Sequence, residues 1–223
     1  MNSENRLPVW LRETEAEGRW TAAGAVIAVI VIHVLLPGTV NISPHWLMPA
    51  LESALLVGLI IANPVAFTRE SRLLRVADIT LIGVISAYNA WIIAREVTRL
   101  IGGREHDAVN LLTTGAGVWV INVLLFALWY WELDRGGPVA RSKARSPYPD
   151  FLFPQMSERD VAPPDWRPTF ADYLYLAFTN ATAFSPTDVM PLSRWAKMVM
   201  LVQSATSLIV VALVIARAIN VLA

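Results

Sequence analysis

Few residues of this sequence combine a reactive side chain with a spacing that catalysis or metal binding requires. There is no cysteine, and the three histidines, His33, His45 and His106, are too scattered to form a metal-ligand pair. The sequence contains neither a G-x-S-x-G nucleophile motif nor a glycine-rich phosphate-binding loop. We therefore expect no catalytic residue, no metal site and no cofactor, and a protein that is not an enzyme.

Ionisable residues inside apolar segments form the first candidate group. A charged side chain at the centre of a bilayer costs at least about 2.5–3.5 kcal/mol, so such a residue usually has a function. Glu52 lies near the start of its segment and is either a structural residue or an ion or proton site. Asp78 follows Arg75 at helical spacing, which allows a local ion pair instead of a site. Arg217, near the end of the last segment, can extend to the membrane surface or act as a functional charge.

A polar break after a short apolar segment is the second candidate. Residues 170–184 read FADYLYLAFTNATAF, about four helical turns, which is too short to cross roughly 30 Å of hydrocarbon. This pattern predicts a re-entrant loop, with a helix lying flat at the interface as the alternative. Copies of Asp188 in an oligomer would form a carboxylate ring that attracts cations, unless the residue only caps a helix. The predicted constriction comprises Thr182, Ala183, Phe184, Ser185, Pro186, Thr187 and Asp188.

The composition requires a membrane environment for these groups. The chain has 223 residues, of which 55% are hydrophobic and 16% charged, whereas about a quarter of a soluble domain is charged. The formal net charge is zero and no basic stripe occurs, so nucleic-acid binding is excluded. The sequence therefore predicts a polytopic membrane protein of the all-α class.

Five apolar segments are expected to cross the bilayer as helices, at residues 20–36, 46–67, 73–94, 111–131 and 195–222. A polar segment, residues 1–19, precedes them and lacks the features of a cleavable signal. We expect residues 20–106 to form a peripheral three-helix region. Residues 107–223 are expected to form a pore-like module, with an extended, water-exposed loop at 134–170 and the re-entrant segment at 170–192.

Small and polar residues inside the segments predict helix contacts. Gly115-Ala116-Gly117 is expected to allow close approach of a neighbouring helix. Interhelical hydrogen bonds are expected from Asn122, Gln203, Ser204, Thr206 and Ser207. Twelve of the 18 lysines and arginines lie in the N-terminal segment and in the loops at 68–75 and 134–170, which predicts a cytoplasmic N-terminus and a loop that enters the membrane from the cytoplasm.

Residues 179–191 resemble the pore pattern of potassium channels, in which a threonine-rich helix end precedes T-V-G-Y-G-D and a later proline. Thr182, Asp188 and Pro191 occupy the matching positions. Ala183-Phe184-Ser185-Pro186-Thr187 replaces T-V-G-Y-G, so both filter glycines are lost. The resemblance implies a pore module without a potassium-selective filter.

The second half of the chain also resembles a family of predicted bacterial inner-membrane proteins of uncharacterised function. The shared features are Gly136-Gly137, Phe153-Pro154, an Asp172-Tyr173-Leu174-Tyr175 entry to a short helix, Thr187-Asp188-Val189, and Ser193-Arg194 before the last span. The resemblance implies the fold and a multi-pass location in the bacterial inner membrane. It implies no activity.

The leading functional hypothesis is a homo-oligomeric, tetrameric ion-channel-like protein with a weak cation preference. Its partners would be the lipid bilayer, further copies of the chain and inorganic ions. A non-conducting scaffold or partner-binding subunit is the first alternative, because Phe184 and Pro186 are bulky or rigid at the constriction. A small ion or proton-coupled carrier that uses Glu52 and Asp78 is the second.

Overall fold

The computed structural model describes residues 9–15, 17–37, 41–62, 72–102, 107–157, 163, 165–182 and 188–222, and this part of the chain is predominantly helical. The helices and strands, in chain order, are η2 (Val9–Leu11), α1 (Trp20–Leu35), α2 (Leu47–Ala62), α3 (Arg72–Ile101), α4 (Ala108–Leu133), η3 (Asp134–Gly136), α5 (Pro138–Ser142), β1 (Phe151–Leu152), α6 (Pro154–Ser157), α7 (Phe170–Thr182), β2 (Met190–Pro191) and α8 (Arg194–Leu222).

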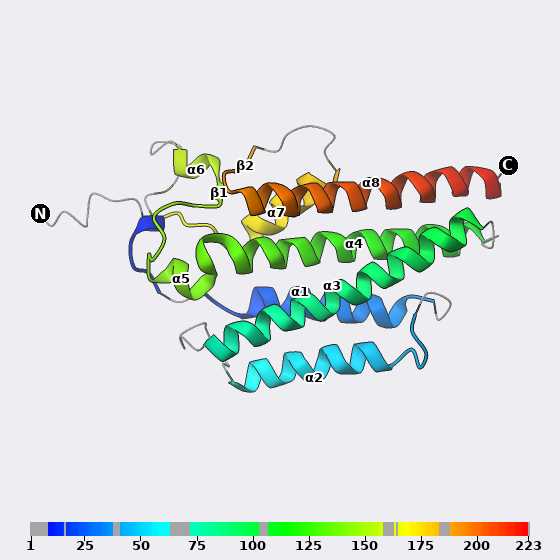
Figure 1. Cartoon of the computed structure of the whole chain (residues 1–223), viewed down its shortest axis with the longest axis horizontal. Coiled ribbons are helices and arrows are strands. Elements are labelled where there is room, and N and C mark those ends of the chain that lie inside the picture. The colour runs from blue at the N-terminus through cyan, green and yellow to red at the C-terminus, as the bar shows by residue number, and fades with distance from the viewer. Residues whose placement is uncertain are drawn as a thin grey trace, which may run out of the picture.

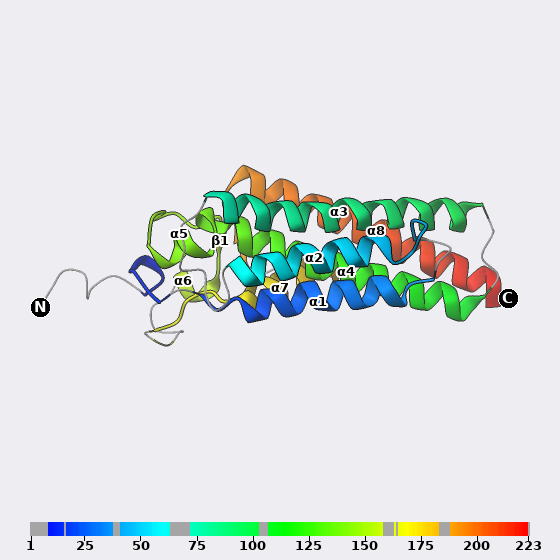
Figure 2. The same cartoon turned by 90° about the horizontal axis from the view of Figure 1, so that it is seen from below.

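Helices α1, α2, α3, α4 and α8 run along the long axis of the molecule (Figures 1 and 2). Helices α1, α3 and α8 begin at the end that also carries η3, α5, α6 and the two strands, and α2 and α4 end there (Figure 1). We call this end of the molecule the loop end. Consecutive long helices therefore run in opposite directions.

Three of these helices are long and apolar enough to cross a membrane: Arg72–Ile101, Val109–Gly136 and Arg194–Ile219. Helices α1 and α2 have 16 residues each. At 1.5 Å per residue each is about 24 Å long, less than the roughly 30 Å of a hydrocarbon core. The described residues therefore contain three candidate spans of full length and two shorter apolar helices.

Helix α4 lies at the centre of the bundle. It contacts α1 and α3 on one side and α7 and α8 on the other, and α2 packs against α1 and α3 (Figure 1). Its buried side chains include Leu111, Val118, Ile121 and Leu128. The helix begins at an Asp107 cap whose carboxylate accepts hydrogen bonds from the Val109 and Asn110 amides.

The glycines of α4 allow its neighbours to approach closely, as the sequence predicted. A Cβ atom at Gly115 would lie 2.6 Å from Cγ2 of Val214 on α8, which is closer than carbon atoms tolerate. A Cβ atom at Gly117 would lie 3.2 Å from Leu36 and 3.3 Å from Ile32, at the end of α1. Small residues at helix contacts in membranes serve this purpose, so the prediction of close packing is confirmed.

The segment after α4 differs from the extended, water-exposed loop that the prolines predicted. Residues 134–157 contain the 3-10 helix η3, the short α-helices α5 and α6 and the strand β1, and Phe151 and Phe153 are buried. β1 pairs antiparallel with β2, with Phe151 opposite Pro191. The chain can turn back sharply because Gly137 has φ 95° and leaves no room for a Cβ beside the Glu132 carbonyl, 2.8 Å away. Buried polar side chains, described below, satisfy the backbone of this turn.

Candidate functional site

Helix α7 is the element that the sequence singled out, and its first turn is fixed at the loop end. The Asp172 carboxylate accepts hydrogen bonds from the amide and hydroxyl of Thr169, at 2.7 and 2.9 Å, and so caps the helix start. The Tyr173 hydroxyl donates to Oδ2 of Asp134 at 2.6 Å. Burial, aided by the nearby Asp134 charge and opposed by Arg141, raises the pKa of Tyr173 well above its ordinary value. Tyr173 therefore remains a hydrogen-bond donor.

The other end of α7 is satisfied by side chains of α8. The last four carbonyls of any helix lack partners within that helix. Here Ser204 Oγ donates to the Asn180 carbonyl at 3.1 Å, and Ser207 Oγ donates to the Ala181 carbonyl at 2.7 Å. One turn earlier, Gln203 Nε2 donates to the Ala177 carbonyl at 2.8 Å. Side chains of α8 therefore satisfy two carbonyls in the last turn of α7.

A buried hydrogen-bond cluster joins α7 to both α4 and α8. Asn180 Nδ2 donates to Gln203 Oε1 at 2.7 Å and to the Met200 carbonyl at 3.0 Å. The Tyr130 hydroxyl donates to the same Gln203 oxygen at 2.5 Å. Trp119 Nε1 donates to Ser207 Oγ at 2.8 Å. We call Tyr130, Asn180, Gln203, Ser204 and Ser207 the α7 anchor.

The α7 anchor confirms part of the predicted set of interhelical contacts. Gln203, Ser204 and Ser207 make these bonds, as expected. Asn122 is buried, but its Nδ2 has no partner among the described residues. Thr206 is half-buried.

The anchor lies far along α8 from the loop end. Gln203 and Ser207 are about 14 and 20 Å from the first residue of α8 at 1.5 Å per residue, and the helix is about 44 Å long. The end of α7 therefore lies beside the middle of α8. The C-terminal end of a helix carries a partial negative charge, so α7 directs that charge toward the middle of the bundle.

The chain returns from α7 to the loop end before α8 begins. Asp150 holds the return segment: its carbonyl accepts from the Leu192 amide at 2.7 Å, and its Oδ1 accepts from Trp195 Nε1 at 2.8 Å. Together with the β1–β2 pairing, these bonds hold both ends of the stretch around α7 at the loop end.

Only two residues of the predicted constriction are among the described residues. Thr182 is the last residue of α7; it is exposed, and its hydroxyl donates to the Phe178 carbonyl at 2.9 Å. Asp188 is exposed at the start of the return segment. Ala183, Phe184, Ser185, Pro186 and Thr187 lie outside the described residues.

Glu52 belongs to a second buried polar cluster, between α1, α2 and α3. Its Oε2 lies 3.1 Å from Nδ1 of His33, and neither side chain has any exposed surface. The His33 ring packs edge-on against Tyr88, whose hydroxyl donates to Asn41 Oδ1 at 3.0 Å. His33 Nε2 and Glu52 Oε1 have no hydrogen-bond partner in the described part of the chain. The sequence predicted no pairing of His33 with Glu52, although antiparallel packing of consecutive helices places the end of α1 beside the start of α2.

Asp78 and Arg217 occupy different surroundings. Asp78 forms an ion pair with Arg19 at 2.9 Å, and Arg19 also donates to the Leu59 carbonyl at 2.8 Å. The ion pair therefore joins α3 to the start of α1, a contact that the spacing to Arg75 did not predict. Arg217 is half-buried near the end of α8. The structure brings neither residue to the end of α7.

The sequence did not predict the buried ion pair between Arg141 and Glu17 at the loop end. Arg141 donates through Nε and Nη2 to the Glu17 carboxylate at 2.9 and 3.0 Å, and it also binds backbone carbonyls at the end of α4. Trp131 Nε1 donates to Glu17 Oε2 at 2.7 Å. Glu17 and Arg141 lie 124 positions apart, so no local spacing could have paired them.

The described residues contain no cluster of three or more His, Cys, Asp or Glu side chains that could hold a metal ion. The hydrogen bonds described above instead hold α7 at both of its ends. Comparisons with protein-family models, with curated proteins and with solved structures give no match to this chain. Its function is therefore argued from its own residues.

Proposed function

We propose that this chain is the subunit of an oligomeric, ion-channel-like membrane protein in which α4, α7 and α8 form the pore module. In this proposal α1 and α2 also cross the membrane, which is locally thinner around these two short helices, and α7 is a re-entrant helix. The three N-terminal helices are peripheral to the pore.

The α7 anchor is the observation that carries the proposal. Irregular backbone at membrane depth is tolerated only where protein or a water-filled cavity surrounds it. Ser204 and Ser207 supply the hydrogen bonds that the end of a helix would otherwise take from water. A helix lying flat at the interface would have no need of partners so far along α8, so this observation favours re-entry.

The charge pattern favours cations over anions. The negative end of the α7 dipole and the exposed Asp188 carboxylate both flank the predicted constriction. Symmetric copies of Asp188 would add a ring of carboxylates, as in cation channels. The loss of the filter glycines argues for a weak preference for cations and against selectivity for potassium.

Cysteine labelling tests the re-entrant geometry cleanly, because the chain contains no cysteine of its own. Thr182→Cys in sealed vesicles should react with a membrane-impermeant thiol reagent from one side only. Leu208→Cys is the control, since Leu208 is exposed on α8 beside Ser207 and should face lipid. Equal, slow labelling of both variants would refute a water-accessible α7 end.

Ion flux and subunit count test the channel itself. Purified protein in vesicles should pass monovalent cations faster than chloride, and Asp188→Asn should reduce this preference without changing the subunit count. Native mass spectrometry should show a tetramer. A monomeric mass, or an ion flux no faster than that of protein-free vesicles, would contradict the channel. The non-conducting scaffold would then be the remaining interpretation.

The His33–Glu52 pair favours a carrier as the second candidate function. A buried imidazole and carboxylate 3.1 Å apart can share one proton, and each has one atom without a partner among the described residues. A carrier would move ions only with a proton gradient and would lose this coupling in Glu52→Gln. Ion flux that does not depend on the proton gradient would exclude the carrier.

A further inference from the structure

A small hollow where α1, α2, α3 and α4 meet contains charged residues that the proposed function does not use. Its volume is about 30 Å³, which is room for about two water molecules. The lining is mostly apolar, and three charged residues complete it: Arg19, Asp78 and Glu132. The ion pair of Arg19 with Asp78, described above, accounts for two of these charges. Glu132 is the third, and the sequence did not single it out.

The Glu132 carboxyl group is buried without a hydrogen bond. Glu132 is 3% exposed, and none of the residues that the structure describes donates a hydrogen bond to its side chain. It is also the last residue but one of α4, where the partial negative charge of the helix end opposes a further negative charge. Burial of an ionised group costs much free energy unless a partner compensates it. Glu132 therefore needs a ligand that supplies positive charge.

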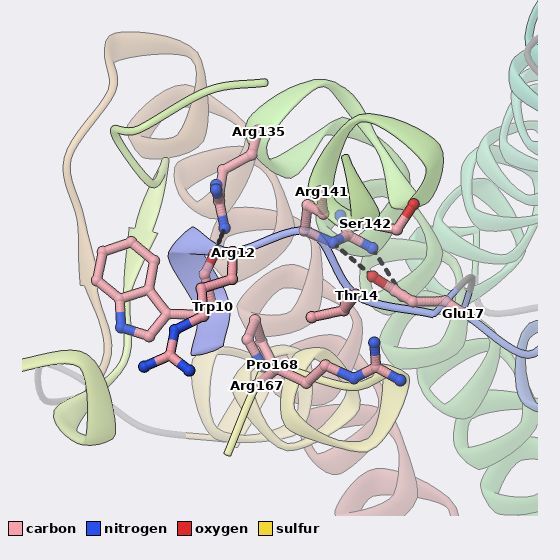
Figure 3. A pocket seen from close by; sticks show the side chains of 9 residues that line it. All are labelled: Trp10, Arg12, Thr14, Glu17, Arg135, Arg141, Ser142, Arg167 and Pro168. Carbon is pink, nitrogen blue, oxygen red and sulfur yellow. Dashed lines mark hydrogen bonds and ion pairs between the residues drawn. The ribbon is translucent and has the colours of Figure 1, made fainter. Parts of the chain in front are cut away.

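The basic residues around Glu132 pair with other groups or lie in water. Besides Arg19, the charged residues that act on it are two acids and two bases: Glu17, Arg75, Asp78 and Arg141. The Arg141 guanidinium faces the Glu17 carboxylate and binds it through two nitrogens (Figure 3). Arg75 is exposed, so solvent and salt screen its charge. Because Arg19 is paired with Asp78, the charges of the hollow sum to one negative charge when Glu132 is ionised.

The lining also decides which cation the hollow can take. A bound Mg²⁺ or Ca²⁺ ion needs about six oxygen ligands. Apart from the three charged residues, the lining side chains are aliphatic or aromatic: Ala22, Ala23, Val26, Leu56, Leu81, Ile82, Leu128 and Trp131. A proton needs a single oxygen. The Asp78 side chain remains 16% exposed, so the hollow reaches the surface near the start of α3, at the loop end.

We propose that this hollow is a proton-binding site in which Glu132 carries the proton while Arg19 and Asp78 stay ionised. The proton comes from water at the loop end and forms an O–H bond with one oxygen of Glu132. It returns to the same water when the site empties. An empty site leaves two carboxylates beside one guanidinium, so release of the proton weakens the contact of α4 with α1 and α3. This site does not depend on whether the protein conducts ions.

Infrared spectroscopy of the detergent-purified full chain tests the site, because a protonated carboxyl group has a carbonyl-stretch band that a carboxylate lacks. At neutral pH, Glu132→Gln should lose the part of this band that corresponds to one carboxylic acid per chain. Glu13→Gln makes the same change at an exposed residue of the N-terminal segment and should keep the whole band. An equal band in wild type and Glu132→Gln would show that Glu132 is ionised and would overturn the proposal.

Exchange with water and the position of the proton are tested in the same spectra. The part of the band that belongs to Glu132 should shift in heavy water, and a rise in pH should remove it reversibly; a part that does neither would show a sealed acid and overturn the exchange. Loss of the band in Asp78→Asn but not in Glu132→Gln would assign the proton to Asp78 and overturn the assignment. Glu132→Asp keeps a carboxyl group and should retain the band. An unchanged helical amide band shows that each variant is folded.

Discussion

Replacement of Gln203 by leucine tests the α7 anchor directly. The substitution keeps the side chain's size and removes three hydrogen bonds, to the Ala177 carbonyl, the Tyr130 hydroxyl and the Asn180 amide. Interhelical hydrogen bonds in membranes contribute about 0.6 kcal/mol each on average and up to about 1.7 kcal/mol. Asn180 keeps its bond to the Met200 carbonyl, so we expect a total loss of about 2 kcal/mol.

The assay is thermal unfolding in a mild detergent, followed by the intrinsic fluorescence of the nine tryptophans. For a chain of this length 1 kcal/mol corresponds to about 2–4 °C in Tm, so Gln203→Leu should lower Tm by about 4–8 °C. The control Val202→Leu changes the neighbouring residue, which is 56% exposed on the same helix, and should leave Tm within about 1 °C.

A double-mutant cycle separates the anchor from a general packing defect. Tyr130→Phe alone removes two bonds of the cluster: the one that the Tyr130 hydroxyl donates to Gln203 and the longer one, at 3.3 Å, that it accepts from Asn180. Its cost should fall by about half in the Gln203→Leu background, because the bond to Gln203 is already absent there. A Tm of Gln203→Leu equal to that of wild type, or fully additive effects of the two substitutions, would refute the reasoning that α7 is held by this cluster.

Three further changes address other parts of the molecule. Gly115→Val should lower Tm by about 2–12 °C, since even a Cβ there would lie 2.6 Å from Val214 and overpacking costs about 1–3 kcal/mol; an unchanged Tm would contradict the close α4–α8 contact. Glu52→Ala should destabilise the fold by about 1–3 kcal/mol by leaving the buried His33 unpaired, as measured by the same melt, whereas no change would show a hydrated site. Asp134→Ala removes the acceptor of Tyr173 at the start of α7 and should increase proteolysis of the loop end, whereas an unaltered digestion pattern would argue against that role.

The sequence predicted the long helices well, because hydropathy summed over a segment needs no knowledge of the neighbours. It misjudged their ends. Helix α3 continues past the expected limit at Ala94 to Ile101, since the charged residues there are good helix formers and no breaker occurs before Gly102. The expected end of the second segment, at Phe67, lies outside the described residues, which reach Ala62 there.

The polar contacts were predictable only in part. Gln203, Ser204 and Ser207 share one face of an apolar helix, so the sequence indicated that they bind something. It could not indicate the carbonyls at the end of α7, because that partner depends on how deep α7 enters. The loop end was predicted wrongly, as an extended chain, because the bonds that fold it come from Glu17 and Asp150, which no local pattern connects to their partners.

The two ends of α7 restrict which element can move if the protein opens and closes. The hydrogen bonds of Asn180, Gln203, Ser204 and Ser207 between α7 and α8, at about 0.6 kcal/mol each, together cost about 3 kcal/mol to break. A conformation with α7 detached from α8 would then be populated below about 1%. The part of α8 beyond Ser207 makes none of these hydrogen bonds to α7 and packs on α4 through Val214 and Gly115. We therefore expect gating to bend or shift the second half of α8, while α7 and the first half of α8 move as one unit.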